Sequence, residues 1–185
     1  MAGKTIDVGG FYGIARLPLV DLKMPGMLNA TIKDSPVFGG KLKSFDASKV
    51  ASMKGVKKVV QVSDTSVAVV ADTFWQAKVA MDQLPIVWDE GANANVQQAD
   101  ILKRLEEGLN ANETFVGNAN GDFKKAASDA SKKIEAKFFY PFLNHAPMEP
   151  MNATAVWSPD RCRAWVPTQD GEASLAAVIT SSSAW

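Results

Sequence analysis

The stretch Met27-Leu-Asn-Ala-Thr-Ile-Lys-Asp-Ser-Pro-Val-Phe-Gly-Gly40 decides the fold of this chain. Its first half, Met27 to Lys33, mixes apolar and β-branched side chains, which predicts a β-strand. Asp34-Ser35-Pro36 ends the strand, because proline has no amide donor and disfavours a helical conformation at the residue before it. Gly39-Gly40 predicts a turn. The first domain is therefore expected to begin with a strand and a turn.

The elements expected after this turn alternate between strands and helices. They are a short helix that starts at Asp46 or Ser48, runs through Met53 and ends at Gly55, strands Val56–Val62 and Ser66–Ala71, a helix Thr73–Leu84 capped by Asp72, and a strand Pro85–Asp89. The order of strand, helix, two strands, helix and strand predicts an α+β domain.

The helix expected at Thr73–Leu84 carries two apolar surfaces. One face, expected to pack on the sheet, consists of Phe74, Ala77, Ala80, Met81 and Leu84. Trp75 and Val79 form a second patch beside it. This patch either widens the buried face or contacts another domain or subunit.

The order of these elements and the sequence motifs within them resemble those of one protein family. The residues that carry the resemblance are Gly26-Met27-Leu28, Ser35-Pro36, Phe45-Asp46, Gly55-Val56, Val67-Ala-Val-Val-Ala-Asp72 and Ala77. They resemble the large, molybdenum-binding subunit of the xanthine dehydrogenase and aldehyde oxidase family, in its isoquinoline 1-oxidoreductase type. The resemblance implies an α/β hammerhead domain, which we expect over residues 1–95. Gly9-Gly10, Gly13 and Pro18 interrupt any long element in Met1–Leu22, so this segment is expected to form an irregular strand beside the hammerhead sheet.

Two further regions are expected after the hammerhead domain. Residues 96–131 form a helical connector, with a helix at Gln98–Leu109 and a brief one at Asp122–Ala130. Residues 132–185 are expected to build a separate sheet from strands at Lys132–Pro141, Met151–Ser158 and Arg161–Val166. The resemblance implies that this last region is the truncated beginning of a molybdopterin-binding domain.

Composition excludes several classes of function. Twenty basic residues balance twenty acidic ones, so the chain has no bulk electrostatic reason to bind nucleic acid or an anionic membrane. A single cysteine, Cys162, excludes an internal disulfide and a multi-cysteine metal site. The sequence contains no apolar run long enough to span a membrane and no signal core near Met1. We expect a cytoplasmic protein, although a longer parent that carries a signal could be periplasmic.

His145-Ala-Pro-Met-Glu-Pro150 holds the only histidine of the chain. His145 and Glu149 could form an acid–base pair or ligate a metal, although Pro147 and Pro150 oppose the helix that this spacing needs for metal binding. We favour a structural role, in which both side chains fix a loop through hydrogen bonds. The resemblance agrees, because the family has His-x-x-x-Glu-Pro where its molybdopterin-binding domain begins and does not use this glutamate as catalytic base.

Gln169 lies in Pro167-Thr168-Gln169, between an expected strand and a helix that would start near Asp170. Read alone, the glutamine could simply satisfy amides at the helix start. The resemblance implies more, since the matching glutamine of the family reaches the oxygen ligands of molybdenum. Gln169 is therefore the one cofactor-binding residue expected, and only in the complete subunit.

The resemblance implies a parent enzyme that hydroxylates an aldehyde or N-heterocycle with oxygen from water. Its partners would be the remainder of the large subunit, a small iron–sulfur subunit and a small-molecule substrate. The family's glycine-rich loop and catalytic glutamate do not appear, and Ala176–Trp185 departs from the family. We therefore expect no catalytic residue, no bound cofactor and no activity in this chain alone. The alternative is a non-catalytic scaffold or subunit-interaction module.

Overall fold

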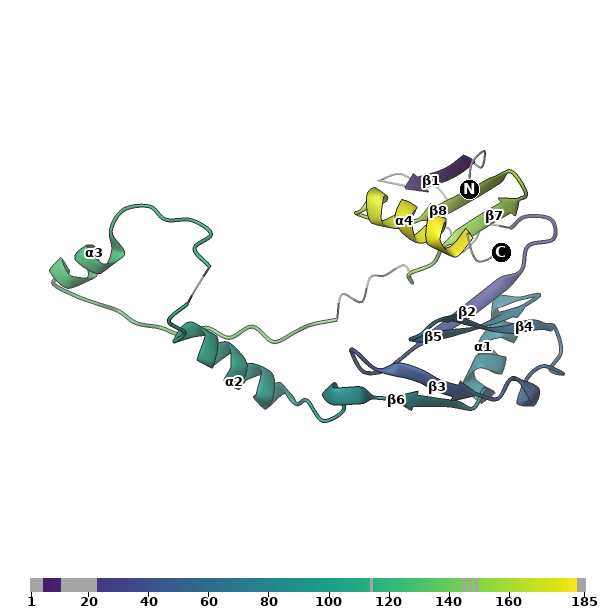
Figure 1. Ribbon diagram of the computed structural model, residues 1–185, viewed down its shortest axis with the longest axis horizontal. Helices are drawn as coiled ribbons and strands as arrows, with labels where there is room; N and C mark the ends of the chain where they lie inside the picture. Colours follow the sequence, from purple (N-terminus) through teal and green to yellow (C-terminus); the bar gives the residue numbers. More distant parts are fainter. Residues whose placement is uncertain are drawn as a thin grey trace. The chain divides into compact units, whose positions relative to one another are not determined.

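The computed structural model describes residues 5–10, 23–113, 115–144, 146, 148 and 150–182. The chain divides into two compact units (Figure 1). Unit 1 combines Met1–Pro25 with Ala136–Trp185, and unit 2 comprises Gly26–Glu135. This division differs from the expected boundaries, since the N-terminal residues group with the end of the chain and not with residues 26–95.

Unit 2 is built on two small antiparallel sheets. The first has the order β2-β5-β4, and the second pairs β3 with β6. The elements are β2 (Asn29–Asp34), β3 (Lys41–Phe45), a 3-10 turn η2 (Ala47–Lys49), β4 (Val56–Ser63), β5 (Ser66–Ala71), α1 (Phe74–Gln83) and β6 (Ile86–Asp89). The unit is therefore mixed α and β, as expected.

The core of unit 2 forms where α1 packs against β5 and β2. Val67 and Val69 of β5 have no exposed surface, because β5 is paired on both edges and these two alternate residues point toward the helix. The buried cluster contains Val50, Val67, Val69, Ala80, Met81 and Leu84. The prediction that Ala77, Ala80, Met81 and Leu84 would be buried is confirmed.

Two details of the predicted helix are wrong. Thr73, not Asp72, is the N-cap: its side chain accepts a hydrogen bond from Gln76 N at 3.3 Å, and Gln76 Oε1 accepts one from Thr73 N at 3.1 Å. Asp72 instead forms an ion pair of 3.0 Å with Lys57. Phe74 is 57% exposed, because the burial of α1 begins one turn later, at Ala77.

Two elements of unit 2 differ from the sequence-based prediction. The helix expected through Met53 shrinks to η2, which Asp46 caps by accepting from Ser48 N at 3.0 Å. No element was predicted for the residues of β3. Its sequence, Lys-Leu-Lys-Ser-Phe, has a weak apolar alternation, and its pairing with β6 shifts register between Leu42 and Ser44. Strand Ser66–Ala71 has the predicted bounds.

The end of unit 2 contains short helices. They are η3 (Gly91–Asn93), α2 (Gln98–Leu109) and α3 (Phe123–Asp129), and α2 has the predicted bounds. Leu105 and Leu109 on the apolar side of α2 are exposed. Among the described residues, no helix is long and apolar enough to cross a membrane.

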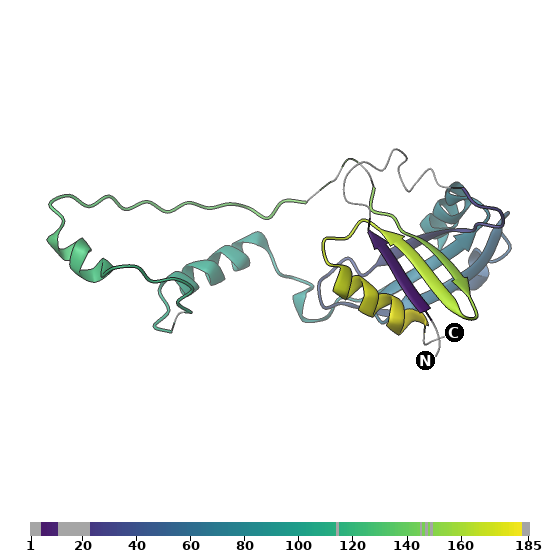
Figure 2. The same ribbon diagram turned by 90° about the horizontal axis from the view of Figure 1, so that it is seen from above.

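Unit 1 contains one three-stranded sheet and a helix (Figure 2). β8 (Arg161–Val166) is central, with β1 (Thr5–Gly10) parallel to it on one side and β7 (Thr154–Ser158) antiparallel on the other. Helix α4 (Gly171–Ser182) contacts β1 and β8. Strand Arg161–Val166 is confirmed at its predicted bounds.

Two further predictions are wrong. The N-terminal segment was expected beside the hammerhead sheet, but β1 pairs with β8. The two strands are far apart in the sequence, so no local sequence pattern predicts this pairing. The segment Lys132–Pro141 was expected to be a strand, but it has no regular structure. Its alternation of apolar residues is real, yet a strand also needs a partner edge.

The capping geometry of α1 predicts the outcome of two substitutions. Thr73→Ala should lower the free energy of unfolding by about 1 kcal/mol, because the helix loses a capping side chain. Asp72→Ala should lower it by less than about 1 kcal/mol, since the ion pair with Lys57 is exposed. Urea denaturation of both variants measures the difference. A larger loss in Asp72→Ala would mean that Asp72 is the effective cap.

A second pair of substitutions tests which face of α1 is the core. Met81 is 3% exposed, so Met81→Ala should cost about 2–5 kcal/mol through lost burial and a cavity. Trp75 is 69% exposed, so Trp75→Gln should change stability by less than about 0.5 kcal/mol. Thermal unfolding of both variants provides the measurement. A comparable loss in the two would show that the Trp75 patch is buried.

Candidate functional site

The candidate site lies at the end of β8, where the chain turns into α4. Thr168 N donates to Val166 O at 3.1 Å, and the Thr168 hydroxyl accepts from Asp170 N at 3.0 Å. The same hydroxyl lies 2.9 Å from Asp170 O, to which it donates. Thr168 therefore closes a tight turn around Gln169.

Asp170 caps the helix that follows. Its carboxylate accepts from Ala173 N at 2.9 Å, and the Ser174 hydroxyl donates to Asp170 O at 2.8 Å. The alternative interpretation of Gln169, that it satisfies amides at the helix start, is therefore wrong, because Asp170 takes that role. The side chain of Gln169 is exposed and makes no hydrogen bond with any described residue.

This arrangement presents a primary amide beside a helix N-terminus. The amide can donate two hydrogen bonds and accept others, and the unpaired amides at the start of a helix add a positive partial charge. Both features suit a ligand with oxygen acceptors. A carboxamide is neutral and a weak metal ligand, so it fits a bond to an oxygen atom on a metal better than direct ligation of the metal.

His145 and Glu149, the other predicted site residues, lie outside the described residues. Beside them, Ala146 has a φ of 38° and donates from its amide to Asn144 Oδ1 at 3.4 Å. Asn152 Nδ2 donates to Pro150 O at 2.9 Å. The expected role of His145 and Glu149 as loop-fixing residues stays a prediction. In the described part of the chain, no three His, Cys, Asp or Glu side chains gather as metal ligands would.

The strand register shows which segments of unit 1 lie at the same end of the sheet as Gln169. Thr154 pairs with Trp165, so the chain enters β7 at the end of the sheet where it leaves β8. The described residues just before β7, including Asn152, therefore lie at the same end of the sheet as the turn that holds Gln169. The topology therefore brings these two segments to one end of the sheet, as a binding site formed by both would require.

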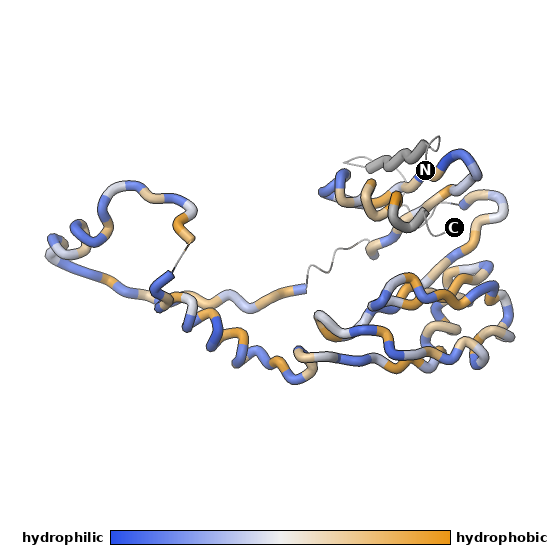
Figure 3. Tube along the Cα trace, viewed as in Figure 1, coloured by the Kyte–Doolittle hydropathy of each residue, from blue (hydrophilic) through white to orange (hydrophobic). Residues whose placement is uncertain are grey.

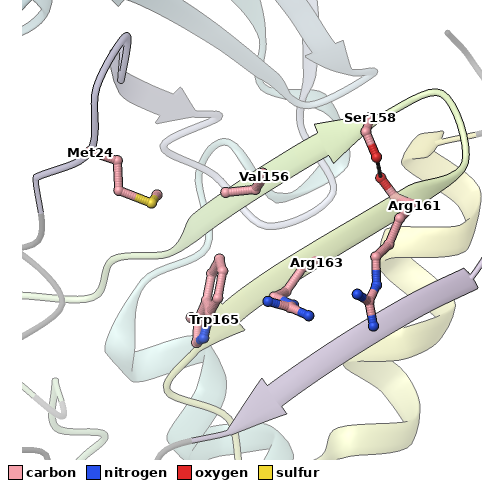
Figure 4. Close-up of a pocket in the computed structure, with 6 residues that line it drawn as sticks. All are labelled: Met24, Val156, Ser158, Arg161, Arg163 and Trp165. Carbon is pink, nitrogen blue, oxygen red and sulfur yellow. Dashed lines mark hydrogen bonds between the residues drawn. The ribbon is translucent and has the colours of Figure 1, made fainter.

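A small cleft lies on the face of the sheet away from α4 (Figure 4). Its volume is about 270 Å³, and its lining residues are Met24, Val156, Ser158, Arg161, Arg163 and Trp165. The guanidinium carbon of Arg163 lies 5.7 Å from the centre of the Trp165 ring, a cation–π distance. The cleft is therefore basic and partly aromatic, and Gln169 is not part of it.

Ser158 connects this cleft to the β7–β8 turn. Its hydroxyl donates to Asp160 Oδ1 at 2.8 Å and lies 3.1 Å from Arg161 O. The bond from Ser158 lowers the pKa of the exposed Asp160 carboxyl below its ordinary value. Sequence reasoning missed the cleft, although Arg161, Arg163 and Trp165 alternate along one strand and therefore had to share a face.

Comparisons with known proteins give three curated relatives. A nicotinate dehydrogenase subunit of Pseudomonas putida is 27% identical over 158 residues, 81% of this chain and 13% of the relative. A membrane-bound aldehyde dehydrogenase (pyrroloquinoline-quinone) of Gluconacetobacter polyoxogenes is 28% identical, over 82% of this chain and 21% of its own. The aldehyde oxidoreductase molybdenum-binding subunit of Escherichia coli O157:H7 is 27% identical, over 88% and 22%.

The chain spans between 13% and 22% of the length of these relatives. Among solved structures, a Cu,Mo-CO dehydrogenase in its carbon monoxide-reduced state is 21% identical, covers 37% of this chain and 12% of its own, and has a TM-score of 0.33. No protein-family model matches the chain. The names of the relatives agree with the resemblance stated above, since the chain is similar to a subunit named as a nicotinate dehydrogenase and to one named as the molybdenum-binding subunit of an aldehyde oxidoreductase.

Proposed function

We propose that this chain is part of the large, molybdenum-binding subunit of an oxidoreductase that oxidises an aldehyde or an N-heterocycle with oxygen from water. The observation that carries the proposal is the similarity to two dehydrogenase or oxidoreductase subunits over 81% and 88% of the chain, the second of which is named as molybdenum-binding. One is named as a nicotinate dehydrogenase subunit and the other as an aldehyde oxidoreductase subunit. Nicotinate is an N-heterocycle, so the two names correspond to the two substrate classes of the proposal.

Within that subunit, Gln169 would orient the molybdopterin cofactor through its side-chain amide. The Thr168 turn holds the backbone on one side of Gln169, and the Asp170 cap holds it on the other. The position of the exposed amide is thus fixed by its neighbours, although the amide itself makes no hydrogen bond within the described part of the chain. The cofactor, when bound, supplies the redox chemistry, and the Gln169 N–H would stabilise negative charge on an oxygen ligand of the metal.

The remaining requirements would be met by other parts of the complete enzyme. The proposal assigns the catalytic base and the other pterin contacts to the remainder of the large subunit. It assigns electron transfer to a small iron–sulfur subunit. This chain alone would then be inactive, and unit 2 would serve as a packing domain for the rest of the subunit.

A second candidate function is a non-catalytic interaction module. Phe74 and Trp75 favour it, because they are 57% and 69% exposed on the first turn of α1. Exposed aromatic pairs of this kind are enriched at protein interfaces. In this case the chain would bind a partner through α1, and Gln169 would have no cofactor.

The two candidates differ in what Gln169→Ala does. In the 185-residue chain this substitution should leave the unfolding midpoint unchanged, because the Gln169 side chain makes no bond there. Asp170→Ala is the matched control and should lose about 1 kcal/mol of stability with the helix cap. In the complete subunit with cofactor bound, Gln169→Ala should lower turnover and alter the Mo(V) resonance spectrum. Wild-type turnover with an unaltered spectrum would rule out the cofactor role.

The proposal also predicts the metal content of the isolated chain. A single neutral amide cannot retain the cofactor, so the purified 185-residue chain should contain no stoichiometric molybdenum. Elemental analysis of protein produced in cells that make the cofactor provides the measurement. Nearly equimolar molybdenum would show that the chain holds a complete cofactor site, and the division of labour proposed here would be wrong.

A further inference from the structure

Asn120-Gly121 is the only Asn-Gly pair in the sequence, and it lies just before the N-cap of α3. Residues 115–122 contain neither helix nor strand, and all of them are exposed. Figure 3 shows the stretch that leads into α3 as mostly hydrophilic. An exposed polar loop can change its local conformation at little cost, which a reaction between neighbouring residues requires.

The fold does not hold the side chain of Asn120. This side chain makes no hydrogen bond in the described part of the chain. Two other exposed asparagines of the same unit differ in this respect. Asn93 Nδ2 donates to Phe38 O at 2.8 Å. Asn110 Nδ2 donates to Glu106 O at 3.0 Å. The amide of Asn120 therefore lacks the contacts that would keep its Cγ atom away from the main chain that follows.

Gly121 leaves the next main-chain nitrogen open to reaction. Its φ is 72°, a conformation that glycine adopts without strain. A Cβ atom placed at Gly121 would meet no other atom within 4 Å, so the space beside its nitrogen is empty of described atoms. In the described part of the chain, the Gly121 N–H makes no hydrogen bond. The nitrogen is thus hindered neither by a side chain nor by a bond that would have to break first.

We propose that Asn120 is a site of spontaneous covalent modification, in which it loses its amide through a cyclic imide formed with Gly121. The Gly121 nitrogen gives up its proton and bonds to Asn120 Cγ, the bond between Cγ and Nδ2 breaks, and ammonia leaves with the proton. Water then opens the ring at either of its two carbonyl groups, which yields aspartate or isoaspartate at position 120. Nothing is oxidised or reduced, and water is the only co-reactant.

The modification changes the segment before α3 and not the core of unit 2. Either product adds a negative charge, and isoaspartate also adds one carbon atom to the main chain. This insertion falls two residues before Asp122, whose carboxylate caps α3 by accepting from Lys125 N at 2.9 Å. The buried cluster of unit 2 contains no residue of this segment. The expected product is a folded chain with a different charge and a different main-chain path into α3.

Peptide mass spectrometry of the 185-residue chain, after incubation at mildly alkaline pH, tests the proposal. Trypsin cleaves after Arg104 and Lys124, so a single peptide contains Asn120 and its matched control, Asn118. Asn118 is also exposed and makes no hydrogen bond in the described part of the chain, but alanine follows it.

Asn120 should lose its amide about tenfold or more faster than Asn118, because only glycine leaves the attacking nitrogen uncrowded and adopts a positive φ without strain. Two products of equal mass, with aspartate and isoaspartate at position 120, should separate by chromatography. Equal rates at Asn118 and Asn120, or an Asn120 amide that persists after both products of an unfolded control peptide have formed, would overturn the proposal.

Two substitutions in the exposed loop exchange the roles of the two asparagines. Gly121→Ala should slow the loss of the Asn120 amide about tenfold, since the added methyl group crowds the nitrogen and disfavours a positive φ. Ala119→Gly places a glycine after Asn118 and should accelerate the loss of the Asn118 amide. Unchanged rates in both variants would contradict the role assigned to Gly121.

The pH dependence tests the chemical step itself. The loss of the Asn120 amide should become faster as the pH rises above neutral, because the Gly121 nitrogen attacks Cγ after it has lost its proton. The rate is measured by the same peptide analysis at several pH values. A rate that does not change with pH would contradict attack by this nitrogen.

Discussion

Unit 1 depends on the pairing of β8 along both of its edges. β1 and β7 come from opposite ends of the chain, and they share a sheet only because β8 bonds to each of them. Alternation along β8 then divides its residues between two surfaces. Arg161, Arg163 and Trp165 line the cleft, while Ala164 is 4% exposed on the other face. The same strand delivers the chain to the Thr168 turn, so the position of Gln169 follows from this pairing.

β5 has the corresponding position in unit 2. It is bonded to β2 and β4, and α1 covers the face that holds Val67 and Val69. The exposed residues of this unit lie where that packing ends, at Phe74 and Trp75 on α1 and at the connector helices. A domain with a small dry core and exposed aromatic residues at its margin is consistent with a piece of a larger subunit.

Local patterns predicted those elements whose side chains alone determine them. Ser66–Ala71 and Arg161–Val166 are runs of strand-forming residues, and Gln98–Leu109 has a clear helical period, so all three have their predicted bounds. Thr73 could also have been found, because Gln76 follows it by three residues, the spacing of a capping box. The strand partner of β1 and the lack of a partner strand for Lys132–Pro141 are long-range properties, which no local window contains. The sequence placed Gln169 correctly just before a helix, but it did not show that the next residue, Asp170, and not Gln169 caps that helix.

We propose that this sequence is part of a much longer molybdenum-binding subunit, and one measurement on the native protein tests this directly. An antibody raised against the folded 185-residue chain can isolate the native polypeptide that contains it, for measurement of intact mass and molybdenum content. We expect a polypeptide several times heavier than 19.9 kDa that contains stoichiometric molybdenum. A native polypeptide of 19.9 kDa without molybdenum would contradict the claim and leave the interaction module as the function of this chain.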